Sequence, residues 1–188
     1  PRFDTTTSFR LFLAIGRHCS LPMVMDPTQF LQGRSRETEI RRDARGRWFN
    51  GADEISHPIL ARAFDGWVDR ADDGRFCLSN SINWAYVEID GPAYFVKDVE
   101  PNAHGIDLIL SGDLRERLDP GSLCQGPEGA LWCAVREGRC PARFDNHAVS
   151  KMSGWIGEDA EGVYVRIAEE KVRPPELDDP LSLGLEKR

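Results

Sequence analysis

The chain has 188 residues, of which 40% are hydrophobic and 29% charged, so it is long enough to bury a substantial core. Its formal net charge of −7 argues against a nucleic-acid-binding role, which normally requires a basic surface. No stretch approaches the roughly 20 apolar residues that a membrane-spanning helix needs, so no membrane span is predicted.

The amino-terminal residues are interpreted either as a strand or helix added to the core or as an upstream extension of the coding region. Residues 10–15 (RLFLAI) are largely apolar, but Arg17 and His18 interrupt the run and no small-residue cleavage site follows. A signal peptide is therefore not predicted. We expect residues 1–25 to form an amino-terminal extension that precedes the first domain.

The cysteines indicate a reducing compartment. Their number is odd, they show no disulfide-framework spacing, and two of them fall in predicted core strands, where a thiol acts as a small apolar side chain. The five are Cys19, Cys77, Cys124, Cys133 and Cys140, with Cys77 and Cys133 in the core strands. The sequence therefore favours a cytoplasmic location.

The first predicted element of the core is a β-hairpin over residues 38–50, which turns at Asp43 to Gly46. A basic run overlaps it, formed by Arg34, Arg36, Arg41, Arg42, Arg45 and Arg47. We interpret this run as the solvated outer face of the hairpin. An anion-binding edge is the alternative.

A helix is predicted next, because apolar residues recur at helical spacing from Ile59 to Val68 and Pro58 suits the first turn. Two further strands, 84–89 and 94–99, are expected to form a hairpin through Asp90-Gly91-Pro92. The polar stretch 100–105 then predicts a domain boundary. Residues 106–110 (IDLIL) predict another strand, and residues 119–129 a surface loop.

The second half predicts the same order of elements as the first. A hairpin over residues 131–144 turns at Glu137-Gly138, and a helix follows whose apolar face is Ala148, Val149, Met152, Trp155 and Ile156. Asp145 or Asn146 is expected to cap this helix.

Two stretches that end these helices, residues 64–78 and 152–167, resemble each other. In each, a Gly-Trp pair is followed by a glycine seven places after the tryptophan and by an aromatic residue two places further on; these are Gly66-Trp67, Gly74 and Phe76, and Gly154-Trp155, Gly162 and Tyr164. Because order, spacing and residue type agree, we interpret the chain as an internal duplication. The sequence predicts an α+β protein of two small domains, each with a β-hairpin, one helix and further antiparallel strands. The domains are residues 26–103 and 104–173, and a flexible, acidic tail covers 174–188.

No motif for catalysis or metal binding is present. The cysteines and histidines lack the close pairs of a zinc site, and the acidic turns lack the ligand pattern of an EF-hand. A nucleophile elbow, a P-loop and a dinucleotide fingerprint are also absent. The sequence therefore predicts no metal, no cofactor and no established catalytic residue, and an enzyme of unrecognised class is the least favoured hypothesis.

The ordered motifs of the chain resemble those of the bacterial "domain of unknown function 1285" family. The resemblance covers roughly residues 37–173 and rests on RDARGRWFNGADEI, HPILARAF, ADDGRFCL and VEIDGPAYFV, then on Ser111-Gly112-Asp113, Val135-Arg136 and Ala142-Arg143. It implies two α+β domains with repeated motifs, the second of them pleckstrin-homology-like, and a ligand cleft at their interface. It also implies a small-ligand or nucleotide-like binding role in signalling. The chain departs from the family at Asn80 to Trp84, which replace a T-P-V-E-K run, and at Ala168-Glu169-Glu170, which replace S-G-G.

These observations lead to a hypothesis of binding. Arg136 and Arg143 flank the second hairpin turn, and a guanidinium is the preferred partner of phosphate or carboxylate. We expect them to anchor a small anionic or nucleotide-like ligand between the two domains. Ser111 and Asp113 would supply polar contacts, and Asn83 and Trp84 hydrogen bonding and stacking. The alternative is an interaction or scaffold protein with a protein partner; the oligomeric state stays open.

Overall fold

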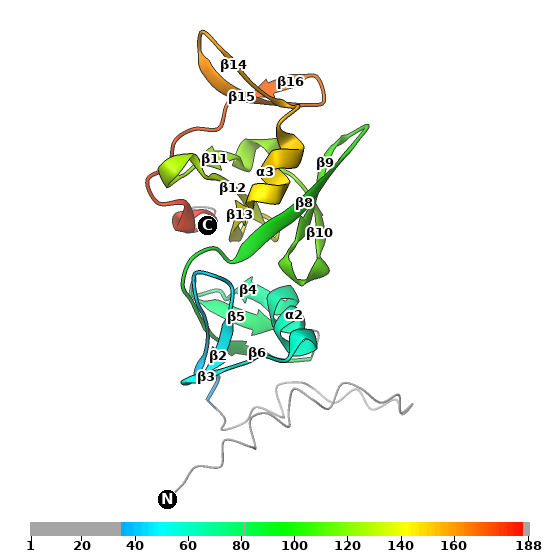
Figure 1. Ribbon diagram of the computed structural model, residues 1–188. Coiled ribbons are helices and arrows are strands. Elements are labelled where there is room, and N and C mark those ends of the chain that lie inside the picture. The colour runs from blue at the N-terminus through cyan, green and yellow to red at the C-terminus, as the bar shows by residue number, and fades with distance from the viewer. Residues whose placement is uncertain (1–34, 81, 186–188) are drawn as a thin grey trace, which may run out of the picture. The chain divides into compact units, whose positions relative to one another are not determined.

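The computed structural model describes residues 35–80 and 82–185 (Figure 1). The predicted extension 1–25, Cys19 and Arg34 lie outside this range. The described part is an α+β fold in which two α-helices accompany four sheets, and most strand pairs are antiparallel. The predicted α+β class is therefore confirmed.

The first half begins with the predicted hairpin. The strands of its sheet are β1 (Ile40–Arg42), β2 (Trp48–Asn50), β3 (Asp53–Glu54) and β7 (Glu88–Ile89), in the order β3-β2-β1-β7. Strands β1 and β2 pair antiparallel, and the Asp43 carboxylate accepts hydrogen bonds from the backbone N–H groups of Arg45 and Arg47 at 3.0 and 2.9 Å. The side-chain cap explains why this local sequence turns where it does.

One arginine of the basic run does not face solvent as the sequence predicts. Arg42 is 0% exposed, and its guanidinium packs under the helix that follows. Its Nη1 lies 3.0 Å from Asp65 Oδ1, and the indole N–H of Trp48 donates to the same oxygen at 2.9 Å. The prediction of a wholly solvated face was wrong at this position, because β1 alternates and turns Arg42 inward.

The predicted helix is α2 (Pro58–Trp67), with proline in its first turn. Its buried Phe64 meets Trp48 edge to face, with ring centroids 5.3 Å apart. A three-stranded antiparallel sheet follows, made of β4 (Val68–Arg70), β5 (Phe76–Ser79) and β6 (Trp84–Tyr86). Gly74 turns β4 into β5 at φ +88°, a conformation that favours glycine.

The expected hairpin between residues 84–89 and 94–99 is wrong. Strand β7 pairs with β1 in parallel, whereas the strand after Asp90-Gly91-Pro92, β8 (Tyr94–Asn102), joins another sheet. Asp90 N–H donates to the Arg42 carbonyl at 2.8 Å, which continues the β1–β7 pairing into the turn. Asp-Gly is a local signal, and long-range pairing overrides it here.

The second half is organised on a six-stranded sheet of order β10-β9-β8-β13-β12-β11. Besides β8, its strands are β9 (Gly105–Leu110), β10 (Arg115–Arg117), β11 (Cys124–Gln125), β12 (Leu131–Val135) and β13 (Cys140–Phe144). Short 3-10 turns connect them, namely η3 (Ser111–Asp113), η4 (Pro120–Ser122) and η5 (Pro127–Gly129). The predicted strand 106–110 and hairpin 131–144 are confirmed, and β8 and β13 pair in parallel.

Helix α3 (Asn146–Met152) packs on strand β8 (Figure 1). Asp145 caps it, as predicted, by accepting a hydrogen bond from Ala148 N–H at 3.0 Å. A three-stranded antiparallel sheet follows, made of β14 (Ile156–Asp159), β15 (Gly162–Ile167) and β16 (Glu170–Val172). Both halves therefore run hairpin, helix, three-stranded sheet.

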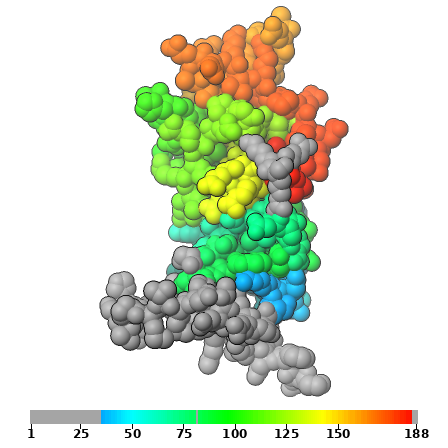
Figure 2. All heavy atoms as spheres, turned by 180° about the vertical axis from the view of Figure 1, so that it is seen from behind, coloured from blue at the N-terminus to red at the C-terminus, as the bar shows by residue number. Residues whose placement is uncertain are grey.

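In the segment 174–185, residues 175–177 lie along strand β11. Gln125 N–H donates to the Pro175 carbonyl and its own carbonyl accepts from Leu177 N–H, both at 2.8 Å. Pro180, in the turn η6 (Pro180–Ser182), is buried and lies near Gly126 and Trp132. Figure 2 shows this stretch, in orange-red and red, against the surface of the same molecule. The flexibility of this segment stays a prediction. The rate of hydrogen exchange at the Leu177 amide, which donates to the Gln125 carbonyl, would measure it.

Four described cysteines, Cys77, Cys124, Cys133 and Cys140, are buried free thiols. Cys77 lies in β5 and Cys133 in β12, so their predicted placement in core strands is confirmed. Burial, then the nearby Asp69 carboxylate, raises the pKa of Cys77 to about 11 and that of Cys140 to about 12.

Because the thiolate is the reactive form, these cysteines should be inert at pH 8. In a Cys19→Ser background, we expect an aromatic disulfide reagent to modify Cys77 and Cys140 of the native protein at least about a hundredfold more slowly than a free thiol, since each pKa unit removes about nine tenths of the thiolate. In urea, all four should react rapidly together. A thiol that reacts at the free rate before unfolding would contradict the buried placement.

Candidate binding pocket

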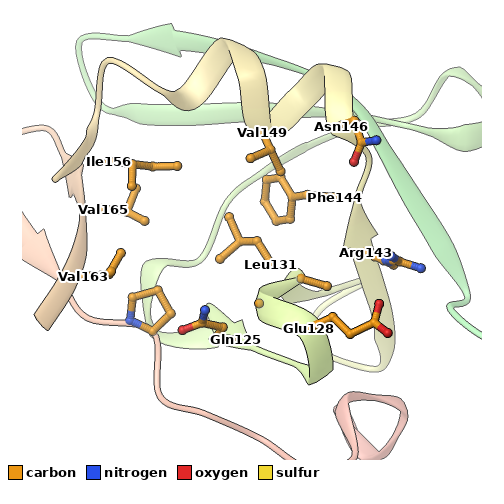
Figure 3. A pocket seen from close by; sticks show the side chains of 13 residues that line it. Gln125, Glu128, Leu131, Arg143, Phe144, Asn146, Val149, Ile156, Val163 and Val165 are labelled. Carbon is orange, nitrogen blue, oxygen red and sulfur yellow. The ribbon is translucent and has the colours of Figure 1, made fainter. Parts of the chain in front are cut away.

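A pocket of about 310 Å³ lies between helix α3, the β12–β13 hairpin and the β14–β15 strands (Figure 3). Its walls are apolar and consist of Ala130, Leu131, Phe144, Val149, Ile156, Val163, Val165 and Pro174, together with Gly129. Its rim carries four polar side chains, Gln125, Glu128, Arg143 and Asn146. Concave sites with apolar walls and a few polar groups are typical of small-ligand binding.

The local sequence explains the walls. Helix α3 turns Ala148 and Met152 into the core, both 0% exposed, which leaves Val149 beside them facing the pocket. Val163 and Val165 are two residues apart on β15, so they share one face of the sheet. Val165 is buried whereas Val163 is exposed, which places Val163 near the mouth. The pocket is thus formed where a helix and a sheet edge do not close completely.

Arg143 is the exposed residue of strand β13, whose other residues are buried. Among the described residues, its side chain makes no hydrogen bond and no ion pair. The nearby carboxylate of Asp145 is already engaged, because it caps α3 and lies 3.7 Å from Lys97 Nζ. Arg143 therefore offers a free guanidinium at the rim.

Glu128 stands on the same rim and has an unusual backbone. Its φ is +60°, inside the turn η5, a left-handed conformation that costs a side-chain-bearing residue about 1–3 kcal/mol. The turn is closed by a 2.8 Å hydrogen bond from Gly126 N–H to the Ala130 carbonyl. Within the described ranges, no hydrogen bond or ion pair holds the Glu128 carboxylate.

The structure places Arg136 away from this pocket. Arg136 lies in the β12–β13 turn, at the opposite end of the hairpin from Arg143. Its backbone N–H donates to Glu116 Oε2 at 2.7 Å, and its Nη2 lies 3.6 Å from Asp69 Oδ2, while Arg139 Nη1 lies 3.0 Å from Asp69 Oδ1. Burial lowers the pKa of Arg136, but the negative groups around it outweigh this and leave the pKa raised. These contacts join the two halves of the chain.

Ser111 and Asp113 belong to the turn η3. Ser111 is buried and its Oγ accepts a hydrogen bond from Phe95 N–H at 3.2 Å. Asp113 is exposed, and its carboxylate lies 3.3 Å from the guanidinium of Arg62 on α2. Both residues therefore contact neighbouring elements of the fold and do not line the pocket.

Asn83 and Trp84 lie at the start of strand β6. Asn83 Oδ1 accepts a hydrogen bond from Trp84 N–H at 2.8 Å. The guanidinium of Arg36 lies 3.8 Å from the Trp84 ring centroid, so one face of the indole is already covered. Of the six predicted site residues, Arg143 alone lines the pocket described here.

The sequence reasoning missed Glu128, Asn146 and the apolar walls as parts of one site. One signal was present, because Val149 and Ile156 belong to the predicted apolar face of the second helix. The helix ends at Met152, so that prediction is wrong at Trp155 and Ile156, and Ile156 lies in β14. That face was assigned to the core, and nothing local distinguishes a pocket wall from a core residue.

The described residues hold no group of three or more histidine, cysteine or acidic side chains placed to bind a metal ion. None of the helices in residues 35–80 and 82–185 is long and apolar enough to cross a membrane.

Comparison with solved structures supports the α+β class and finds two structures that resemble this one. The α+β fold is shared with a DUF1285 family protein from Silicibacter pomeroyi, at 18% identity and a TM-score of 0.55 over 72% of this chain and 78% of that chain. A second DUF1285 family protein, from Shewanella baltica, matches at 14% identity and a TM-score of 0.47, over 60% of this chain and 87% of that chain. The chain therefore resembles the DUF1285 family, as its motifs predict. No family model and no curated protein matches the sequence.

Proposed function

We propose that the protein is a binding module for a small ligand with an anionic group and an apolar part. The observation that carries this proposal is the unpaired guanidinium of Arg143 at the rim of a pocket with apolar walls. The volume of about 310 Å³ is at the lower end of small-molecule sites, so the ligand is small.

Each part of the pocket suits one part of such a ligand. Burial of aliphatic groups against Leu131, Val149 and Ile156 favours binding by about 0.8 kcal/mol per methylene. A guanidinium can hold a carboxylate or phosphate through two parallel hydrogen bonds, which orients the ligand as well as binding it. A nucleotide-like ligand would place its base against Phe144 and its phosphate at Arg143.

This proposal places the ligand against the second predicted domain, residues 104–173, and Pro174 of the tail, rather than between two domains. A site between the domains that uses Arg136, Ser111, Asp113, Asn83 and Trp84 stays a prediction. The pleckstrin-homology-like character of the second domain, a role in signalling and a cytoplasmic location also stay predictions.

We retain the internal duplication as part of the proposal. It is supported by the order hairpin, helix, three-stranded sheet in both halves, and by Trp67 and Trp155, each directly before a strand. Gly74 and Gly162 both adopt positive φ, +88° and +109°. In this view, the pocket beside the second helix is a feature that one copy acquired.

The test measures ligand-induced thermal stabilisation of the full chain with hexanoate, octanoate, inorganic phosphate and a nucleotide panel. A ligand at ~100 times its Kd should stabilise the protein by about 2.7 kcal/mol. We expect Arg143→Gln to weaken the binding ligand at least about tenfold, because a charge-assisted hydrogen bond contributes about 1.5–3 kcal/mol. Arg166→Gln is the matched control, because Arg166 is exposed on β15 outside the pocket.

Two results would reject the proposal. One is the absence of stabilisation by every anionic ligand of the panel. The other is stabilisation that Arg143→Gln leaves unchanged, which would place the bound anion elsewhere on the molecule.

A further inference from the structure

We infer that the pocket binds a free α-amino acid with an aliphatic side chain. This inference rests on the proposed function and specifies its ligand. It follows from the charges on the rim, which have both signs, and from the shape of the walls, which are largely aliphatic.

The rim carries one unpaired cation and one unpaired carboxylate. Arg143 and Glu128 both line the pocket, and within the described ranges neither makes an ion pair or a side-chain hydrogen bond. A ligand with only an anionic group would meet Glu128 as well as Arg143, and like charges repel. A zwitterion satisfies both, with its carboxylate at Arg143 and its ammonium at Glu128.

The charged and apolar parts of the pocket lie on different sides. Figure 3 shows Arg143, Glu128 and Asn146 on one side, and Ile156, Val163 and Val165 on the other. An α-amino acid has the same division, because both charges sit on one carbon and the side chain extends from it. The aliphatic side chain would point toward the β14–β15 wall, and the charged end toward the rim.

The backbone holds Glu128 at the rim. Glu128 has a φ of +60° between Pro127 and Gly129, and the turn is closed by backbone hydrogen bonds. Behind it, Gly126 packs so closely that a Cβ would lie 2.7 Å from both Pro180 and Trp132. No described side-chain contact of Glu128 compensates this strained backbone, which is the kind of outlier found at ligand sites.

The neutral polar groups of the rim add to this recognition. Asn146 and Gln125 line the pocket and carry both donors and acceptors, so each can bond to either end of a zwitterion. The walls set the side-chain preference. Leu131, Val149, Ile156, Val163 and Val165 are branched and apolar, so leucine, isoleucine and valine should bind better than polar amino acids.

The experiment compares four ligands by calorimetry on the full chain. L-Leucine carries both charges, L-leucinamide lacks the carboxylate, 4-methylpentanoate lacks the ammonium, and glycine lacks the side chain. We expect L-leucine to bind at least about tenfold more tightly than each of the others. L-Leucinamide and 4-methylpentanoate each lose one charge-assisted hydrogen bond with the rim.

Two variants assign the charges. Glu128→Gln should weaken L-leucine at least about tenfold and strengthen 4-methylpentanoate, because it removes the repulsion. Arg143→Gln should weaken L-leucine and leave L-leucinamide unchanged. Glu137→Gln is the control, because Glu137 also has positive φ, +58°, and lies outside the pocket. Melting temperatures establish that each variant folds.

The outcomes separate this inference from the proposed function. If 4-methylpentanoate binds as tightly as L-leucine and Glu128→Gln changes neither, the amino-acid inference is wrong while the anionic site stands. If no ligand binds and the anionic panel also shows no dependence on Arg143, both are wrong. If L-leucine binds but neither rim variant affects it, the ligand occupies another place and the inference is likewise overturned.

Discussion

Replacing Arg42 by methionine is expected to lower the free energy of unfolding by about 3 kcal/mol, the lower end of the usual loss for a buried ion pair, because the Asp65 side chain keeps 21% of its surface exposed. The Arg42 side chain is 0% exposed. Its Nη1 lies 3.0 Å from Asp65 Oδ1, and its Nη2 donates to the carbonyls of Pro92 and Ala93, the latter at 2.7 Å. Methionine preserves much of the apolar stem and removes all of these donors.

The loss has two sources. The Asp65 carboxylate would keep the hydrogen bond from Trp48 Nε1, at 2.9 Å, but would lose its positive partner. The buried carbonyls of Pro92 and Ala93 would lose their side-chain donor, and each unsatisfied buried group costs about 1–3 kcal/mol. Burial lowers the pKa of Arg42, because it disfavours the charged guanidinium. The contacts with Asp65 oppose this effect and stabilise the charged form.

Urea denaturation measures the effect, and Arg45→Met is the matched control. Arg45 belongs to the same hairpin but is exposed, so its replacement should change stability by less than about 0.5 kcal/mol. The double variant Arg42→Met with Asp65→Asn should recover part of the loss, because the partly buried carboxylate is not left without its cation. Equal effects of the two single arginine variants would show that Arg42 is not buried in this way.

Replacing Gly112 by alanine is expected to lower the free energy of unfolding by about 3 kcal/mol, the sum of about 1–2 kcal/mol for a left-handed residue and about 1–3 kcal/mol for overpacking. Gly112 has a φ of +78°. A Cβ at this position would lie 2.4 Å from Gly66 N and 2.6 Å from Gly66 Cα. These are backbone atoms of helix α2, so they cannot swing aside as the end of a side chain does.

Gly154→Ala provides the control for Gly112→Ala. Gly154 lies just after helix α3, and Gly66 lies at the end of helix α2. A Cβ at Gly154 would meet no atom within 4 Å. We expect its replacement to change stability by no more than about 0.5 kcal/mol. Chemical denaturation of both variants tests the difference. If Gly112→Ala proves as mild as Gly154→Ala, the close approach of η3 to α2 is incorrect.

Gly66 and Gly154 occupy the same place in the two stretches that resemble each other, residues 64–78 and 152–167. Each of them directly precedes a tryptophan, yet only Gly66 is in contact with the backbone of another turn, at Gly112. The sequence repeat predicts two similar chain paths, and the two glycines have different neighbours in the structure. A repeat records local geometry, whereas what packs against it depends on the rest of the chain.

Local patterns predicted those elements that depend on near neighbours. The apolar spacing of α2, the Asp145 cap of α3 and the β12–β13 hairpin are all decided by residues within about one turn or one hairpin of each other. The parallel pairs β1–β7 and β8–β13 were not predicted. They join Arg42 to Ile89 and Ala142 to Tyr94, and no local signal specifies which distant strand a strand will meet.

The sequence by itself determined the α+β class, the main helices and hairpins and the resemblance to the DUF1285 family. The tertiary structure decided which of several similar residues became buried or exposed. Arg42 and Arg45 have the same side chain, and Arg42 is buried because α2 and the start of β8 pack over it. Likewise, residues 125–174 form a pocket with Arg143 at its rim only after three elements come together. The sequence specifies the type and spacing of the residues, but the burial of a side chain depends on which distant segments pack against it.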